Sequence, residues 1–183
     1  MTAERRLTAA DVIATVADPD SFVAWPTAPD PATTTEGYAG SLQRARAKAQ
    51  TQESVVVGAA TIGGRPVALL VGEFGFLAGS VGMAAADTIR FAVARATRDG
   101  LPVLAAPTSG GTRMQEGTLA FLRMVPIAGV VAAHRRAGLA FLVWLRNPTT
   151  GGVQATWGSL GQVTAAEPGA LVGFLGPRVF SAV

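Results

Sequence analysis

Two glycine-rich loops hold the residues whose types and spacing are best suited to chemistry. The pairs Gly110-Gly111 and Gly151-Gly152 each follow an apolar run, residues 101–106 and 139–145, of the kind that forms a buried strand. A diglycine backbone approaches a ligand closely because no Cβ stands in the way, and we expect these turns to leave backbone N–H groups unpaired. Two such loops predict two oxyanion sites, the charge-stabilising device that acyl chemistry requires.

The glycine patterns do not match nucleotide-binding motifs. Neither loop contains the dinucleotide fingerprint or the phosphate loop that ends in Gly-Lys-Ser/Thr. We therefore set aside kinase, ATPase and dehydrogenase functions. A third pair, Gly63-Gly64, lies between two strand-like runs and predicts only a hairpin turn.

The composition fits one compact domain with an unusually apolar surface. The chain has 183 residues, of which 49% are hydrophobic and only 15% charged, so we expect a partner to cover part of it. The absence of cysteine excludes disulfides, thiolate metal sites and a cysteine nucleophile. A single histidine, His134, leaves no cluster for a zinc site, and we predict no metal.

Charge and hydropathy indicate which classes of partner to expect and where in the cell the protein is located. The net charge is +3, but the basic residues are scattered, which does not favour nucleic-acid binding. This charge would attract a phosphorylated small molecule such as a coenzyme A ester. The sequence predicts no membrane association, since no apolar run approaches the roughly 18 residues of a membrane span. The N-terminus does not resemble a signal peptide, so we expect a cytoplasmic protein.

The order of elements predicts an α/β fold behind an N-terminal arm. Residues 1–36 are rich in proline and threonine, and we expect turns and extended segments there. Pro126 falls inside the last expected helix and predicts a kink or break. Helices are expected over residues 37–50, 83–98 and 114–136, and strands over 54–62, 65–71, 101–106, 139–145, 162–165 and 170–174.

Strands that alternate with helices place both diglycine loops at one end of the sheet. In such folds, ligands bind at the carboxyl ends of the strands. The two loops are therefore expected to form one site.

Four phrases occur in a fixed order along the chain, and together they resemble the carboxyltransferase β subunit of acetyl-CoA carboxylase and its acyl-CoA carboxylase relatives. The likeness covers roughly residues 21–178. The phrases are Glu73-Phe-Gly-Phe-Leu-Ala-Gly-Ser-Val-Gly82, Ser109-Gly-Gly-Thr-Arg-Met-Gln-Glu116, Pro148-Thr-Thr-Gly-Gly-Val153 and Ala166-Glu-Pro-Gly-Ala-Leu-Val-Gly-Phe-Leu-Gly-Pro-Arg-Val179.

This resemblance implies a crotonase-like fold, a superhelix of repeated ββα units that is incomplete here at the C-terminus. Residues 37–183 would form a partial carboxyltransferase domain of the N-type, β-subunit-like kind. The resemblance also implies an α-type carboxyltransferase subunit and a biotin carboxyl carrier protein as partners in a hetero-oligomer.

The resemblance further implies a biotin-dependent carboxyltransferase reaction on acetyl-CoA or a similar acyl-CoA. In the family, carboxybiotin releases CO2, biotin then removes a proton next to the thioester, and the resulting enolate captures the CO2. The protein needs oriented donors rather than acid and base side chains. By resemblance, the catalytic oxyanion donors are the backbones of Gly110, Gly111, Gly151 and Gly152. Acyl-CoA and biotin binding is assigned to Gly79, Ser109, Thr112 and Thr150.

Other polar and aromatic side chains are expected to have structural roles. Arg113 is predicted to pair with Glu116 on the helix surface, and Glu73 is expected to be structural as well. His134 would suit a helix C-terminus as a positive side chain. Trp144 and Trp157 are expected to pack in the core, and the role of Arg178 stays open.

The sequence departs from the family pattern in three ways. It carries no four-cysteine zinc ribbon, it has Pro126 in a helix, and it stops at Val183 where family members continue. The chain would then be a fragment, a truncated paralogue or half of a split enzyme. Two alternative functions stay open: a subunit of the malonate-decarboxylase kind, which stabilises the same enolate without biotin, and an inactive acyl-CoA-binding or assembly subunit.

Overall fold

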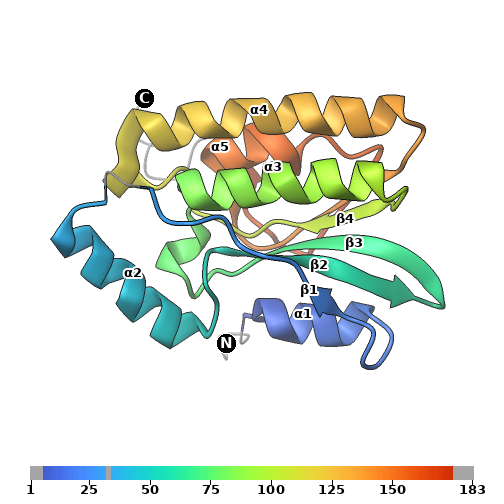
Figure 1. Cartoon of the computed structure of the whole chain (residues 1–183), viewed down its shortest axis with the longest axis horizontal. Coiled ribbons are helices and arrows are strands. Elements are labelled where there is room, and N and C mark those ends of the chain that lie inside the picture. Colours follow the sequence, from blue (N-terminus) through green and yellow to red (C-terminus); the bar gives the residue numbers. More distant parts are fainter. Residues whose placement is uncertain (1–5, 32–33, 175–183) are drawn as a thin grey trace.

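The computed structural model describes residues 6–31 and 34–174, which form layers of helices on a six-stranded sheet (Figure 1). The helices are α1 (Ala9–Val16), α2 (Glu36–Ala49), α3 (Met83–Arg98), α4 (Gly117–Arg136) and α5 (Gly151–Val153), with the short turns η1 (Leu77–Gly79), η2 (Met114–Glu116) and η3 (Gln154–Gly158). The strands are β1 (Val23–Ala24), β2 (Val55–Ile62), β3 (Arg65–Gly72), β4 (Val103–Ala106), β5 (Phe141–Leu145), β6 (Thr149–Thr150), β7 (Val163–Ala166) and β8 (Val172–Gly173). These bounds confirm the elements expected from residue 37 onward.

The main sheet has the order β1-β2-β3-β4-β5-β7. Strands β2 and β3 form the predicted antiparallel hairpin, and Gly63 and Gly64 at its turn have φ angles of 57° and 74°. Strands β3, β4, β5 and β7 run parallel, so their carboxyl ends, where both diglycine loops begin, lie at one edge. A separate small sheet pairs β6 with β8.

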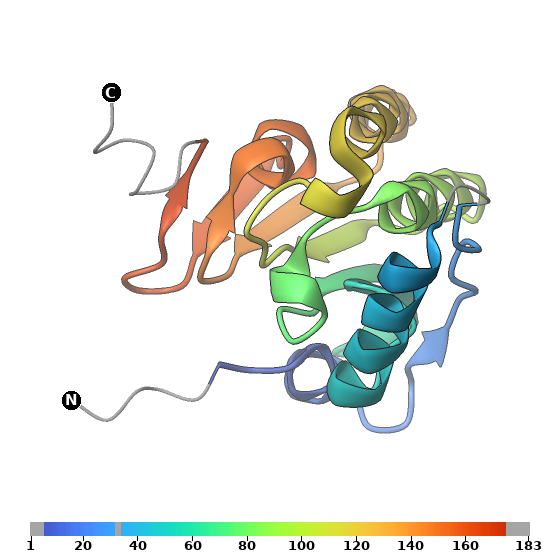
Figure 2. The same ribbon diagram turned by 90° about the vertical axis from the view of Figure 1, so that its left-hand side faces the viewer.

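The sheet separates two hydrophobic cores, because successive side chains of a strand point to opposite faces. Ala68 and Leu70 of β3 belong to the core under α3 and α4, whereas Leu69 and Val71 belong to the core under α1. Figures 1 and 2 show α3 and α4 side by side over one face and α1 on the other.

The N-terminal segment is more ordered than its composition predicts. Residues 9–16 form α1, which packs against β2 and β3, and β1 pairs with β2. The expectation of only turns and extended segments is wrong here. Thr8 and Asp11 form a capping box at the start of α1, and this pattern, which stabilises helix N-termini, is the signal that was missed.

The sequence predicted a kink or break at Pro126, and the structure shows no break there. Helix α4 continues through Pro126, and the chain instead breaks at Gly117, where φ is 56° between η2 and α4. The carbonyl of Leu122, which loses its helical donor to Pro126, belongs to an exposed residue, so water can replace the missing hydrogen bond.

The stretch Met114–Arg136 passes the length and composition test for a membrane span, contrary to the expectation from the sequence. One face of the helix packs on α3 and the core through Ala120, Met124 and Ile127. Its other face exposes Leu119, Phe121, Leu122 and Val125.

Candidate functional site

The two diglycine loops lie directly against each other at the carboxyl ends of β4 and β5. The Ser109 N–H donates to the Pro148 carbonyl at 2.6 Å, and the Thr150 N–H donates to the Ser109 carbonyl at 3.1 Å. A Cβ placed on Gly151 would lie 3.1 Å from the Gly111 Cα. Backbone therefore meets backbone at this point, and the expectation of one shared site agrees with this geometry.

Three of the four glycine amides already have partners, so the premise that these turns leave their N–H groups unpaired is wrong for them. The reason is that each of these N–H groups donates a hydrogen bond to a residue of its own loop or to one that packs beside it. Gly110 donates to the Ala78 carbonyl (2.9 Å), Gly111 to Ser109 Oγ (2.9 Å) and Gly151 to the Phe174 carbonyl (3.1 Å).

One amide from each loop has no hydrogen bond to any residue in the described part of the chain: Thr112 in the first loop and Gly152 in the second. These residues are neighbours, because a Cβ on Gly152 would lie 3.0 Å from Thr112 Oγ1. Gly152 is buried, and buried N–H groups rarely stay without a partner. These two amides are therefore the donors of the two diglycine loops that remain available to a ligand.

The reason why a glycine is required differs from one loop position to the next. Gly111 and Gly151 have φ angles of 114° and 63°, which L side chains rarely adopt. Gly152 has no such angle, but a Cβ there would approach Met124 Cε to 2.6 Å. At Gly79, with φ 65°, a Cβ would overlap the Thr108 carbonyl oxygen.

The side chains predicted to bind ligand serve mainly to hold the loops together. Ser109 Oγ accepts from the Gly111 N–H, and Thr150 Oγ1 donates to the Ser109 carbonyl at 3.2 Å. Thr112 is half-buried and lies beside the second loop. Ligand contact by these residues and by Gly79 stays a prediction.

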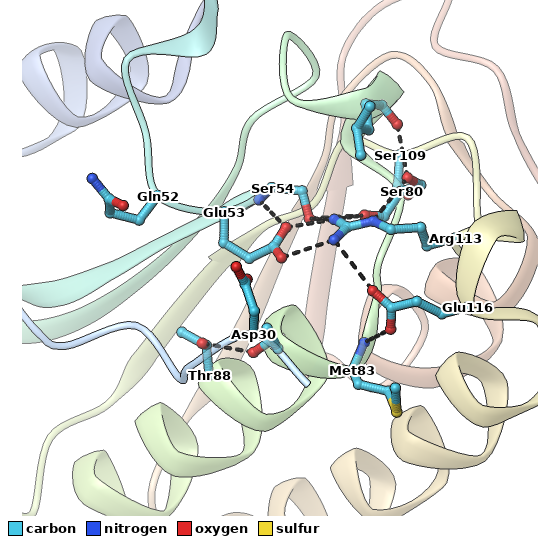
Figure 3. Close-up of polar contacts among 12 residues, drawn as sticks. Asp30, Gln52, Glu53, Ser54, Ser80, Met83, Thr88, Ser109, Arg113 and Glu116 are labelled. Carbon is cyan, nitrogen blue, oxygen red and sulfur yellow. Dashed lines mark hydrogen bonds and ion pairs between the residues drawn. The ribbon is translucent and has the colours of Figure 1, made fainter. Parts of the chain in front are cut away.

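A buried ionic network lies behind the first loop (Figure 3). Arg113 is fully buried, and its Nη1 donates to Glu53 Oε2 at 2.8 Å while Nη2 contacts the other oxygen of the same carboxylate. The predicted pair with Glu116 exists at 3.6 Å, but it is not on the helix surface. Glu53 was missed, since the sequence gives no spacing signal for a partner 60 residues away.

Two further carboxylates have structural contacts, as expected. Glu116 Oε2 accepts from the Met83 N–H at 2.5 Å, at the start of α3, where a negative charge is favourable. Glu73 accepts from the Ala9 N–H at 2.6 Å and from the Gly75 N–H at 2.7 Å.

A second buried arginine, Arg146, precedes the second loop. Its Nη1 donates to the Gly72 carbonyl at 2.9 Å, and its Nη2 donates to the Leu7 carbonyl. The carboxylate of Glu167 lies 3.6 Å from Arg146 Nε and is partly exposed. Burial therefore dominates, and it lowers the pKa of Arg146 despite the charges of Glu167 and Glu73.

A basic cleft of about 580 Å³ lies between α2 and the segment of residues 74–78. Its walls include Arg6, Arg44 and Lys48, and the Arg6 guanidinium stacks 3.9 Å from the centre of the Phe74 ring. Ala78, whose carbonyl holds Gly110, also lines the cleft. Arg6 Nε donates to the carbonyl of residue 147, next to the second loop, at 3.0 Å. Within the described ranges, neither Arg44 nor Lys48 pairs with a carboxylate.

The single histidine is not the charged helix-end residue that was expected. His134 is buried between Thr97 Oγ1, 2.9 Å from Nδ1, and the Ala140 carbonyl, 3.2 Å from Nε2. Burial lowers the pKa of His134, although the contact with Ala140 raises it.

Trp157 is buried in one core and Trp144 packs against the other, as predicted. Arg178 lies outside the described residues.

The chain matches one protein family over nearly its whole length. The model of the family "Carboxyl transferase domain" matches residues 2–183. The chain is 54% identical over 175 residues to a Mycobacterium bovis protein named "Probable biotin-dependent acyl-coenzyme A carboxylase beta3 subunit", covering 96% of this chain and 35% of that protein. It is 45% identical over 142 residues to the acetyl-coenzyme A carboxylase carboxyl transferase subunit beta of Desulforamulus reducens, covering 78% of this chain and 49% of that protein.

Solved structures confirm the crotonase-like α/β fold. Transcarboxylase 12S, with methylmalonyl-coenzyme A and methylmalonic acid bound, superposes with a TM-score of 0.82 at 24% identity over 97% of this chain and 32% of that chain. The Pseudomonas malonate decarboxylase MdcD-MdcE heterodimer gives 0.74 at 22% identity, over 96% of this chain and 68% of that one. The chain thus spans about a third to a half of the two sequence relatives. With its motifs and fold both matched, the chain belongs to the carboxyl transferase domain family.

Proposed function

We propose that this chain supplies the acyl-CoA side of a biotin-dependent acyl-CoA carboxyltransferase, as its β-type subunit. In this role it binds an acyl-CoA thioester and stabilises the enolate to which the carboxyl group is transferred. One observation carries the proposal: the two diglycine loops meet backbone to backbone, and each leaves one amide, Thr112 or Gly152, without a partner among the described residues.

The free amides suit an oxygen that becomes negative during the reaction. Both belong to backbone that the rest of the chain already fixes, so no reorganisation is needed when the charge develops. The buried position of Gly152 increases the strength of its hydrogen bond, because the local dielectric is low. We assign these amides to the thioester oxygen of the enolate or to the ureido oxygen of biotin.

The site fits the biotin group, since donors to a carbonyl-type oxygen are available and no acid or base side chain is required. When bound, carboxybiotin on its carrier protein would supply the carboxyl group as CO2, and the biotin left after this release would accept the proton. The chain's own contribution is to hold the thioester in one orientation, which lowers the entropic part of the barrier.

The basic cleft suits the phosphates of coenzyme A. Arg6, Arg44 and Lys48 give it positive charge, and two of its residues contact the diglycine loops. In this proposal, a coenzyme tail held there extends toward the diglycine loops through Ala78, which lines the cleft and accepts from the Gly110 N–H. The partner proteins we propose are an α-type carboxyltransferase subunit and a biotin carboxyl carrier protein. The exposed apolar face of α4 supports the need for a partner.

Reconstitution tests this function. The chain is mixed with the α-type subunit, the carrier protein, biotin carboxylase and ATP, and transfer of labelled bicarbonate to acyl-CoA is measured. We expect label in the acyl-CoA only when the chain is present. Binding of acyl-CoA without transfer would favour the assembly-subunit alternative, and release of CO2 from malonyl thioesters without biotin would favour the decarboxylase.

Variants of the cleft test the coenzyme assignment. Replacing both Arg44 and Lys48 by Gln should raise the KM for acyl-CoA about 100-fold, since each lost phosphate contact is worth about 1.4 kcal/mol, or a factor of about ten. The value of kcat should change little. Arg98→Gln, an exposed arginine on α3 away from the cleft, is the matched control. Equal KM values for both variants would remove the cleft from the coenzyme site.

A further inference from the structure

The buried pair of Arg113 and Glu53 has no part in the chemistry described above. Both side chains are almost completely inaccessible, with exposed fractions of 0% and 1%. Burying two charges is costly and often adds no net stability over an apolar pair. Such a pair therefore needs a reason beyond stability.

The surroundings of Arg113 balance its charge and fix its orientation. Burial by itself disfavours the guanidinium, but the hydrogen bonds and charge of Glu53 outweigh it and raise the pKa of Arg113. The hydroxyl of Tyr38, on α2, donates a hydrogen bond to Glu116 and accepts one from Arg113 Nη1 at 3.2 Å. The two carboxylates exceed the one guanidinium by one negative charge, which the N-terminus of α3 offsets through Met83.

Arg113 is also tied to the first diglycine loop through its own backbone. Its N–H donates to the Val81 carbonyl at 3.0 Å, and the Val81 N–H donates to the Gly111 carbonyl at 2.9 Å. Its Nη2 donates to the Ser80 carbonyl at 2.6 Å. One residue therefore binds residues 80 and 81 with both its side chain and its main chain.

The same segment holds the loop from the other side. The Ala78 carbonyl accepts from the Gly110 N–H, so residues 78–81 run along the whole loop. Gly82 allows this arrangement, because a Cβ there would lie 2.8 Å from Arg113 Nη1 and would overlap Glu116 Oε1. Figure 3 shows Arg113 between Glu53, Ser80 and Glu116.

We propose that Arg113 is a positioning residue, which fixes the first diglycine loop against the second by clamping it to residues 80 and 81, with Glu53 as its buried counter-charge. The inference rests on the proposed function for its catalytic consequence. A shift of the loop would move the Thr112 amide away from Gly152 while the basic cleft stays in place. The expected effect is therefore on kcat rather than on KM.

Arg113→Lys tests this, because it keeps the charge but loses the planar fork that reaches Glu53 and Ser80 together. In the reconstituted enzyme, we expect kcat to fall about 100-fold, the size of effect that a misplacement of about 1 Å produces. The KM for acyl-CoA should stay within about twofold. Tyr38→Phe, which removes one hydroxyl from the network, should lower kcat by a smaller factor, and Arg98→Gln should leave it unchanged.

A second measurement does not depend on activity. Hydrogen exchange of the amides of residues 110–113 should be at least tenfold faster in Arg113→Lys and in Glu53→Gln, while amides in the centre of β3 keep their rates. An unchanged kcat with unchanged exchange would overturn the proposal, as would an equal rise in exchange across the whole chain, which indicates general destabilisation. Faster loop exchange in a chain without carboxyltransferase activity would leave the positioning role intact and refute the proposed function instead.

Discussion

The two diglycine loops have the same sequence pattern and contact each other, but the chain anchors them by different means. Arg113, which follows the first loop, is paired with the buried carboxylate of Glu53. Arg146, which precedes the second, donates mainly to the main-chain carbonyls of Gly72 and Leu7. The first loop is thus anchored by a close pair of buried opposite charges. The second is anchored mainly by hydrogen bonds from a buried arginine to neutral carbonyl oxygens.

This difference indicates where rigidity is concentrated. A buried charge pair is satisfied in one geometry only, because either partner left alone would be a buried, uncompensated charge. Carbonyl acceptors penalise displacement less. We therefore expect the first loop to be the fixed reference and the second to be the more tolerant of the two.

The largest effect on stability is expected when either anchoring arginine, Arg113 or Arg146, is replaced. Arg113→Leu should lower the free energy of unfolding by about 3–5 kcal/mol, because Glu53 then stays buried without a counter-charge. Arg146→Leu should cost less, about 1–3 kcal/mol, because the main-chain carbonyls lose a donor, while Glu167 can turn to solvent and the buried Glu73 keeps its hydrogen bonds from the Ala9 and Gly75 N–H groups. Urea unfolding followed by circular dichroism measures both values.

The exposed Arg123 provides the control, and Arg123→Leu should change the free energy of unfolding by less than about 0.5 kcal/mol. If Arg146→Leu proved as costly as Arg113→Leu, the two anchors would be equivalent and the comparison would fail.

The next test uses the glycines themselves. Gly151→Ala should cost about 2 kcal/mol, because its φ of 63° is strained for alanine and the new methyl would press on Gly111. Gly110→Ala is the matched variant in the first loop, where a Cβ would lie 3.6 Å from the Ala78 carbonyl oxygen and φ is not positive. It should change stability by no more than about 0.5 kcal/mol. Thermal unfolding of both variants distinguishes them, and equal shifts in Tm would contradict the assignment.

The smallest effect concerns the strand that leads to the second loop. His134 contacts the carbonyl of Ala140, directly before β5, and burial holds its pKa below the ordinary value of 6.5. Below that pH the unfolded chain binds a proton that the folded chain does not, so stability should decrease as the pH falls through this window. The difference in unfolding free energy between the parent and His134→Gln should shrink as the pH falls. A constant difference would show that His134 titrates equally in both states.

Much of this structure could be predicted from local pattern. The hairpin around Gly63-Gly64, helix α3 and the strands before both diglycine loops follow from periodicity and turn residues. Helix α1 was missed although its capping box was present. The break at Gly117 instead of Pro126 was also missed, because a proline is tolerated in a helix where its missing hydrogen bond faces water.

The sequence by itself determined where the two diglycine loops lie, that a strand precedes each of them and that the chain resembles one family, because these properties depend on neighbours along the chain. The tertiary structure alone decided which amides stay free and that Arg113 meets Glu53 rather than solvent. Hydrogen bonds between residues 30 or more positions apart depend on how the layers pack, and no spacing in the sequence encodes them.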